Sequence, residues 1–177
     1  VDIVLPDPSF IVERRKHLLG IVLTHAHEDH VGAIPYLWER LECPIYATSY
    51  TAALVQRKLE HVGLDAECDI HRISYRKPFE LGPFEITYIN ITHSIPESSA
   101  LLIRTDVGSV VHSGDWKLDP EPLVGKTTDE LFFREVGKSG VDALICDSTN
   151  VFRQGESGSD AEVLEDRNST RPNSSHW

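Results

Sequence analysis

The stretch that decides the fold reads Thr24-His25-Ala26-His27-Glu28-Asp29-His30. Its imidazole and carboxylate groups are spaced His-x-His-x-Asp-His, and such groups are the usual protein ligands of Zn²⁺ and similar ions. The apolar run 20–23 before it predicts a buried strand, and the run 31–38 after it predicts the opening of a helix. The stretch is therefore a strand-to-helix loop whose side chains can converge on one point. The alternative is a polar loop that happens to hold three histidines.

The motif His25-x-His27-x-Asp29-His30 resembles the signature of the metallo-β-lactamase superfamily. Two later residues extend the resemblance. His93 is similar to the next metal ligand of that family, and Asp115 is similar to its metal-bridging aspartate. Four stretches together resemble the ribonuclease J family, the RNA-processing branch with an inserted β-CASP domain: Asp2–Pro8, His93–Ser98, Gly114–Asp119 and Asp147–Asn150. The resemblance implies an α/β fold, a partial metallo-β-lactamase αββα sandwich.

The resemblance covers residues 1–163, which we expect to form one partial metallo-β-lactamase-like domain. The opening strands of the family, its β-CASP insertion and its last metal-ligand segment are expected to be absent. Residues 164–177 are expected to be a disordered tail derived from a vector. Leu164-Glu165 is what a common restriction site encodes, and the polar run that follows has no periodicity. His176 would then not be a metal ligand.

The composition fits one globular domain, with 177 residues, 40% of them hydrophobic and 25% charged. No run approaches the length of a transmembrane helix, so we expect no membrane partner. Cys43, Cys68 and Cys146 lack a Cys-x-x-Cys pair, which predicts reduced thiols in a cytoplasmic protein. The net charge of −11 argues against a nucleic-acid surface, because phosphate contacts need clustered Lys and Arg. Bound cations would neutralise Asp29 and Asp115.

The resemblance implies two metal subsites built from the matching residues: His25, His27 and His93 for the first ion, Asp29 and His30 for the second, and Asp115 as the bridge. His25 and His27 alternate on an extended segment and so point the same way. Asp29 and His30 lie past the bend and are expected to aim elsewhere. Three imidazoles leave the open position that a catalytic zinc requires. We expect Zn²⁺, with Mn²⁺ or Mg²⁺ as alternatives, a weak second site, and catalytic roles for Asp29 and Asp115.

Further candidates depend on this motif for support. Without it, His93 would more often be a packing or surface residue and Asp115 part of a turn. Asp147 ends an apolar strand and has two open roles, which are to cap a loop or to accept a hydrogen bond from a ligand imidazole. Hydroxyl groups that could contact a substrate phosphate belong to Ser94, Ser98, Ser148 and Thr149. The remaining histidines are expected to be structural or solvated, and they are His17, His61, His71 and His112.

The hydrophobic pattern predicts a β/α alternation with inserted hairpins. Strands are expected over 20–24, 44–48, 70–74, 79–81, 84–91, 100–105, 109–113 and 142–146. Helices are expected over 9–18 with Ser9 as N-cap, and over 31–41, 49–62 and 128–137.

The leading hypothesis is a metal-dependent hydrolase that resembles ribonuclease J and cleaves RNA phosphodiesters with metal-activated water. A second hypothesis is a small-molecule hydrolase of the same superfamily, acting on a β-lactam, a lactone or an ester. A third is a metal-binding fragment that self-associates and has no useful turnover. The expected partners are therefore RNA or a small molecule, together with a second copy of the chain through exposed sheet edges.

Overall fold

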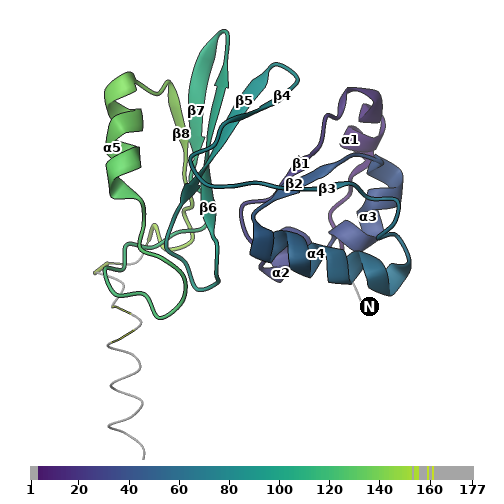
Figure 1. Cartoon of the computed structure of the whole chain (residues 1–177), viewed down its shortest axis with the longest axis horizontal. Helices are drawn as coiled ribbons and strands as arrows, with labels where there is room; N and C mark the ends of the chain where they lie inside the picture. The colour runs from purple at the N-terminus through teal and green to yellow at the C-terminus, as the bar shows by residue number, and fades with distance from the viewer. Residues whose placement is uncertain (1–3, 153, 156–158, 160, 162–177) are drawn as a thin grey trace, which may run out of the picture.

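The computed structural model of the chain describes residues 4–152, 154, 155, 159 and 161. These residues form four layers in the order helices, sheet, sheet, helix (Figure 1). The predicted α/β fold, an αββα sandwich, is confirmed. The start of the stretch Asp2–Pro8 and the predicted tail 164–177, which includes His176, lie outside the described residues. No helix in the described part is long and apolar enough to span a membrane.

The first sheet is parallel and has three strands, β1 (Ile21–Val22), β2 (Ile45–Ala47) and β3 (Ile70–Arg72), in that order. Its outer face is covered by helices (Figure 1), and these are α1 (Ser9–Val12), α2 (Glu28–Val31), α3 (Ile34–Leu41) and α4 (Ser49–Val62). A 3-10 turn, η1 (Arg15–His17), follows α1. Parallel strands need crossover connections, and the helices supply them here. Gly63 ends α4 with a φ of +75°, which glycine adopts readily.

The second sheet has five strands in chain order: β4 (Phe79–Leu81), β5 (Phe84–Asn90), β6 (Ser99–Thr105), β7 (Gly108–His112) and β8 (Ala143–Ile145). The first four are joined as antiparallel neighbours, whereas β8 pairs with β7 in parallel. The β7–β8 connection carries α5 (Glu130–Ser139), which lies on the outer face of this sheet (Figure 1). The predicted hairpins around Gly82 and Val107 are both present.

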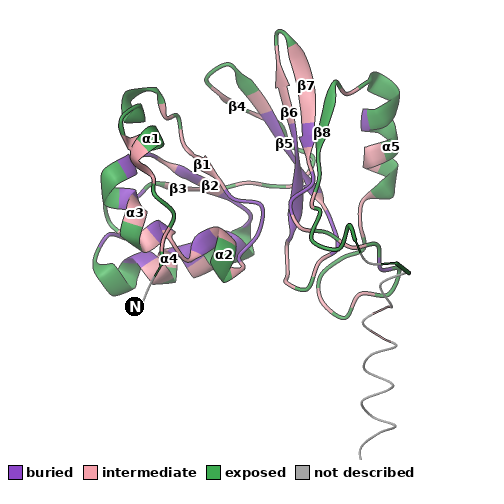
Figure 2. Cartoon of the chain, turned by 180° about the vertical axis from the view of Figure 1, so that it is seen from behind, coloured by how far each residue is buried: buried purple, intermediate pink, exposed green. Residues whose placement is uncertain are grey.

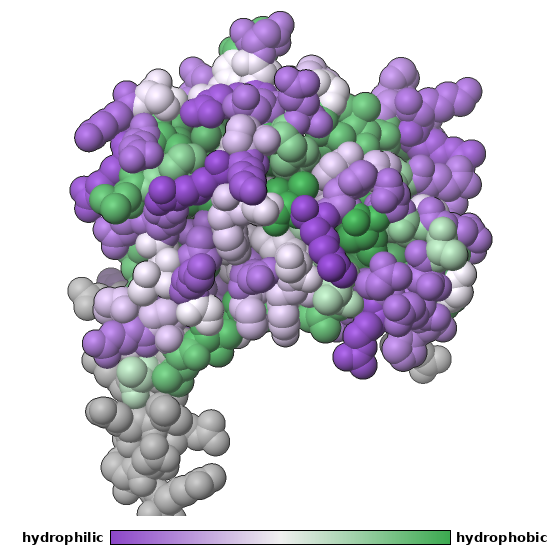
Figure 3. Space-filling model, viewed as in Figure 1, coloured by the Kyte–Doolittle hydropathy of each residue, from purple (hydrophilic) through white to green (hydrophobic). Residues whose placement is uncertain are grey.

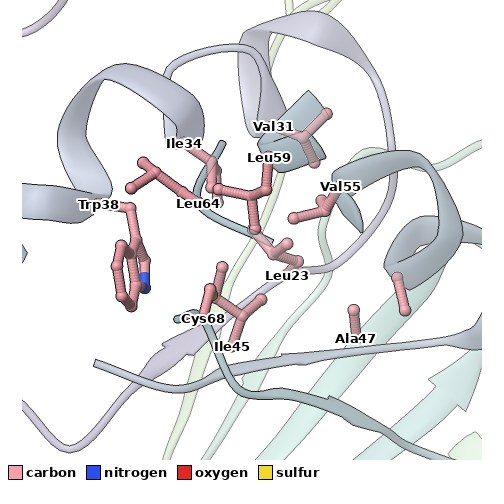
Figure 4. Packing of buried hydrophobic residues seen from close by; sticks show 11 residues of the cluster. Leu23, Val31, Ile34, Trp38, Ile45, Ala47, Val55, Leu59, Leu64 and Cys68 are labelled. Carbon is pink, nitrogen blue, oxygen red and sulfur yellow. The ribbon is translucent and has the colours of Figure 1, made fainter. Parts of the chain in front are cut away.

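Three hydrophobic clusters hold the four layers together (Figure 2). In the first, Trp38 and Leu59 from the helices pack with Ile45 of the first sheet (Figure 4). The second lies between the second sheet and α5, where Val136 is buried. The third fills the space between the sheets and contains Tyr88, which is fully buried. Burial of one large apolar side chain stabilises a fold by about 1.5–3 kcal/mol, so the clusters account for the layering.

Tyr88 also joins the two sheets through its hydroxyl. Its Oη lies 3.1 Å from the carbonyl oxygen of Leu23 and 2.8 Å from that of Tyr46, so one proton is shared between two acceptors. Burial raises the pKa of Tyr88 well above its ordinary value. The phenol is therefore a neutral donor that fixes β5 of the second sheet against the ends of β1 and β2 of the first.

Three predictions about helices need correction. The helix expected over 9–18 is only one turn followed by η1, and Ser9 does not cap it; instead Asp7 Oδ1 accepts from the Ser9 backbone N–H at 3.0 Å. The helix expected over 31–41 begins three residues later, as α3 with Pro35 in its first turn, and a separate one-turn helix, α2, precedes it. Asp129 starts α5 two residues later than expected, since its side chain accepts from the Phe132 N–H.

β8 is an exposed edge strand of the second sheet. Leu144 is 65% exposed and Ile145 54% exposed. Within the described part of the chain, no strand pairs with the outer edge of β8. On the face drawn in Figure 3, hydrophobic groups appear as separate patches among hydrophilic residues.

Candidate metal centre

The histidines and aspartates singled out by the sequence come together at one edge of the two sheets. His25 and His27 follow β1, and His30 lies in α2 directly after them. His93 follows β5, and Asp115 follows β7. The first sheet thus contributes three imidazoles, and the second contributes one imidazole and one carboxylate.

His25, His27 and His93 form the first candidate metal group. The Nδ1 atom of His27 lies 3.1 Å from Nε2 of His25 and 3.1 Å from Nε2 of His93. One ring nitrogen carries either one proton or one lone pair, so His27 Nδ1 cannot fully satisfy both neighbours by hydrogen bonding. One cation could accept a lone pair from each of the three rings. The donor set therefore fits a metal ion.

His25, His30 and Asp115 form the second candidate group, and their ligand atoms lie within 4.8 Å of one another. The Oδ2 atom of Asp115 is 3.3 Å from Nε2 of His30 and 3.8 Å from Nε2 of His25. It is also 3.9 Å from Nε2 of His93, which belongs to the first group. Asp115 therefore borders both groups, as a bridging ligand must.

Two of the predicted orientations differ in the structure. His30 was expected to aim away from His25, yet their ring centroids are 4.0 Å apart. The reason is that His27 is the N-cap of α2, so His30 lies three residues on and faces the same side. The side chain of Asp29 is 77% exposed, and its Oδ2 is 3.5 Å from His30 Nε2. Asp29 is thus beside the cluster and belongs to neither candidate group.

Burial keeps the key imidazoles neutral. Burial, with a smaller contribution from the neighbouring His30 and His93, lowers the pKa of His25 to about 4. The pKa of His93 is also lowered, chiefly by burial. A metal ligand must offer a lone pair, so these shifts favour the ligating form at neutral pH.

Three residues outside the predicted set support the cluster. Thr24 Oγ1 lies 3.0 Å from Nδ1 of His25 and can fix the tautomer of that ring. Gly114 has a φ of +61° in the turn before Asp115, and its backbone N–H donates to Nδ1 of His112 at 3.1 Å. This bond gives His112 the structural role expected for it. The third residue is Glu97, whose Oε2 accepts from the Tyr50 N–H at 2.7 Å.

Asp147 makes the bonds of a loop cap. Its Oδ1 accepts from the Thr149 N–H at 2.8 Å and from the Thr149 hydroxyl at 2.7 Å, and the carboxylate also accepts from the Trp116 N–H. No hydrogen bond joins Asp147 to an imidazole among the described residues. Of the two open roles, the contacts match the loop cap, although its charge raises the pKa of His93.

The predicted substrate hydroxyls do not all reach the surface. Ser94, Ser148 and Thr149 are exposed. Ser98 is 1% exposed, and its hydroxyl donates to the Ile95 carbonyl at 3.4 Å. A substrate cannot touch Ser98 in this structure, which corrects that prediction. His17, His61 and His71 lie away from the cluster, and Nδ1 of His61 bonds to the Arg57 carbonyl in its own helix.

Comparison with known proteins places this chain in a family. The sequence profile of the β-lactamase superfamily domain matches residues 4–151. Ribonuclease J of Sinorhizobium meliloti is 47% identical over 165 residues, covering 93% of this chain and 29% of that protein. Ribonuclease J of Helicobacter pylori strain 26695 is 39% identical over 164 residues, covering 92% and 24%. Ribonuclease J2 of Bacillus subtilis is 35% identical over 163 residues, covering 92% and 29%.

The chain therefore spans less than a third of the length of each of these relatives. Among solved structures, a protein of unknown function from Enterococcus faecalis V583 has a TM-score of 0.55 at 18% identity, covering 80% of this chain and 34% of that one. A likeness at this identity supports the layered fold alone.

Proposed function

Because this chain belongs to the metallo-β-lactamase superfamily, we propose that it forms the metal-binding part of a ribonuclease J-like hydrolase that cleaves RNA phosphodiesters. One observation carries the proposal, which is the convergence of four imidazoles and the Asp115 carboxylate where the two sheets meet. The curated relatives named as ribonucleases supply the substrate class. Reduced cysteines at Cys43, Cys68 and Cys146 support a cytoplasmic location.

In this proposal the first ion would be held by His25, His27 and His93, and a second by His30 and Asp115 with Asp29 beside them. Zn²⁺ is the proposed ion, because neutral imidazoles dominate the donor set, and Mn²⁺ or Mg²⁺ are the alternatives. A bound ion supplies Lewis-acid activation of the phosphodiester and of the attacking water. The chain's own residues then have to orient both reactants.

Asp115 is the residue proposed to orient the water. Its side chain is 33% exposed, so Oδ2 faces both the cluster and solvent and can accept a hydrogen bond from a water molecule. Asp29 is proposed to hold His30 in place through its 3.5 Å contact with Nε2. The exposed hydroxyls of Ser94, Ser148 and Thr149 are proposed to donate to phosphate oxygens of the substrate.

The test is cleavage of a fluorescently labelled RNA oligonucleotide by the full chain, with and without a chelator. We expect slow cleavage that the chelator abolishes and that His25→Ala/His27→Ala abolishes. His17→Ala is the matched control, because His17 is exposed in η1 and lies away from the cluster. Cleavage that survives both the chelator and the double variant would refute the assignment.

Net charge favours one second candidate, a small-molecule hydrolase of the same superfamily. The chain carries a formal charge of −11, which repels a polyanion but does not hinder a β-lactam, a lactone or an ester. A chromogenic β-lactam assayed with and without chelator separates the two candidates. Chelator-sensitive β-lactam hydrolysis without RNA cleavage would favour the second candidate.

A further inference from the structure

We propose that Glu97 is a positioning residue that sets His93 against His25 and His27, an inference that rests on the proposed metal site. The two upstream histidines belong to the first sheet, whereas His93 belongs to the loop after β5 of the second. The 3.1 Å separation between His27 Nδ1 and His93 Nε2 therefore depends on how that loop is fixed to the first half of the fold. Glu97 makes that connection.

The side chain of Glu97 caps α4 from a distance of 47 residues along the chain. Its Oε2 accepts from the Tyr50 backbone N–H at 2.7 Å, in the first turn of the helix. The N-cap residue Thr48 makes no side-chain cap bond of its own. Its Oγ1 instead shares its proton between the Glu97 carbonyl and Thr51 Oγ1, each 3.3 Å away. A carboxylate at this position satisfies an unpaired N–H and lies at the positive end of the helix dipole.

The loop that carries His93 and Glu97 is closed on itself, so its two ends move together. The Ser98 carbonyl accepts from the Ile91 N–H at 3.1 Å, which joins the residues on either side of the loop. The same carbonyl accepts from the Tyr75 hydroxyl at 3.1 Å. A displacement of Glu97 from α4 would therefore be passed on to His93.

The backbone of Glu97 supports a specific role for this side chain. Its φ is +56°, in the left-handed region that favours glycine. A glutamate held there must be retained by its contacts, which are the Tyr50 N–H at its carboxylate and the hydroxyls of Thr48 and Ser99 at its carbonyl. Replacement by glycine would relieve the backbone strain and remove the contact between the Glu97 carboxylate and the Tyr50 N–H. An effect of this contact on the position of His93 can then be distinguished from an effect of backbone strain on stability.

The experiment is a Co²⁺ titration of the full chain followed by visible absorption, with thermal melting of each variant. Wild type should bind Co²⁺ with the spectrum of a low-symmetry site. Glu97→Ala should weaken binding about tenfold or more and change the spectrum, the size of effect seen when a residue that orients a ligand is lost. Glu97→Gln should restore most of the affinity, since its amide oxygen can still accept from Tyr50.

Two further variants complete the design. Glu97→Gly should melt no earlier than Glu97→Ala yet bind Co²⁺ equally weakly, because it also lacks the carboxylate contact with the Tyr50 N–H. Glu85→Ala is the matched control, since Glu85 on β5 pairs only with the exposed Arg104 among the described contacts, and it should bind like wild type. Wild-type affinity in Glu97→Gly or Glu97→Ala would overturn the positioning role. A wild type that binds no Co²⁺ would refute the proposed metal site itself, and the positioning role with it.

Discussion

The position of Asp115 depends on the turn at Gly114. The φ of Gly114 is +61°, and a Cβ atom there would lie 2.7 Å from the Ser99 carbonyl oxygen and 3.3 Å from Thr24. A backbone oxygen cannot move away as a flexible side chain can. Asp115, which borders both candidate metal groups, is thus preceded by a position where only the hydrogen of glycine fits.

Gly114→Ala should therefore destabilise the fold by about 2 kcal/mol or more, combining left-handed strain with the close contact. Urea denaturation of the full chain measures this. Gly137→Ala is the matched control, because a Cβ at Gly137 in α5 meets nothing within 4 Å. That control should stabilise the chain slightly, by about 0.5–1 kcal/mol. Equal stabilities for the two variants would show that the turn at position 114 is not restrictive.

For single residues, the sequence identifies the candidate metal ligands but not the residues that orient those ligands through hydrogen bonds. The spacing of His25, His27 and His30 is local, so a motif can reveal it. Thr24 and Glu97 act through contacts that depend on the folded chain, and Glu97 reaches Tyr50 across 47 residues. A threonine at the end of a buried strand is a weak signal for a ligand partner, and a glutamate in a loop gives none.

At the scale of single elements, the N-cap residue of α5, Asp129, also forms an ion pair with Arg76 in the segment between β3 and β4. Asp129 Oδ1 accepts from the Phe132 N–H at 3.2 Å, and Oδ2 accepts from Nε of Arg76 at 2.6 Å. The Arg76 guanidinium holds the pKa of Asp129 below its usual value. A carboxyl with a lowered folded-state pKa contributes stability above its unfolded-state pKa, and that stability is lost as the pH falls through the folded-state pKa.

Asp129→Asn should keep the cap but lose the ion pair. Arg76 is half exposed, so the expected loss is only about 0.5–1 kcal/mol at pH 7. The difference from wild type should shrink below about pH 4, where the wild-type carboxyl begins to protonate. Urea denaturation at pH 7 and pH 3 tests this, with Glu130→Gln as a control for the exposed pair with Arg134. If the difference in unfolding free energy between wild type and Asp129→Asn were larger at pH 3 than at pH 7, the ion pair would not be its cause.

Local sequence predicts where a helix begins and ends better than it predicts which face of the helix is buried. α4 spans Ser49–Val62 as predicted, because Gly63 provides the stop. The sequence favours an apolar side made of Ala53, Leu54, Leu59 and Val62. Leu59 is buried and Leu54 is half-buried, but Ala53 is exposed and Val62 is 47% exposed. The buried side contains Ala52 and Val55 instead, because the sheet and α3 decide which face is covered. Apolar residues lie on more than one side of α4, so its sequence alone does not reveal that choice.

At the scale of the whole molecule, the exposed edge of β8 is the feature that predicts association. Leu144 and Ile145 combine an exposed apolar surface with an outer strand edge that no strand pairs within the described residues. Such an edge is a template for pairing with another chain. We expect dimers or larger species at micromolar concentration in multi-angle light scattering. Leu144→Lys should shift them toward monomer, while Val107→Lys should not, because Val107 lies at a hairpin tip. A monomeric wild type would contradict this.

The two candidate metal groups cannot bind an ion with equal affinity at the same time, because they share a residue. His25 is a member of both groups, and its Nε2 can give its lone pair to one ion only. If the first ion takes His25 together with His27 and His93, the second keeps His30 and Asp115, with Asp29 mostly exposed beside them. We therefore expect calorimetric Zn²⁺ titration to show one tight event per chain and a much weaker second event.

Single substitutions separate the two events. His93→Ala should remove the tight event, because His93 belongs to the first group alone, whereas His30→Ala should remove only the weak one. His61→Ala, on the far end of α4, serves as the control for losing an imidazole elsewhere. Two equally tight events in wild type would mean that a further ligand completes the second subsite. A second copy of the chain, joined through β8, could supply it, and the event would then depend on protein concentration.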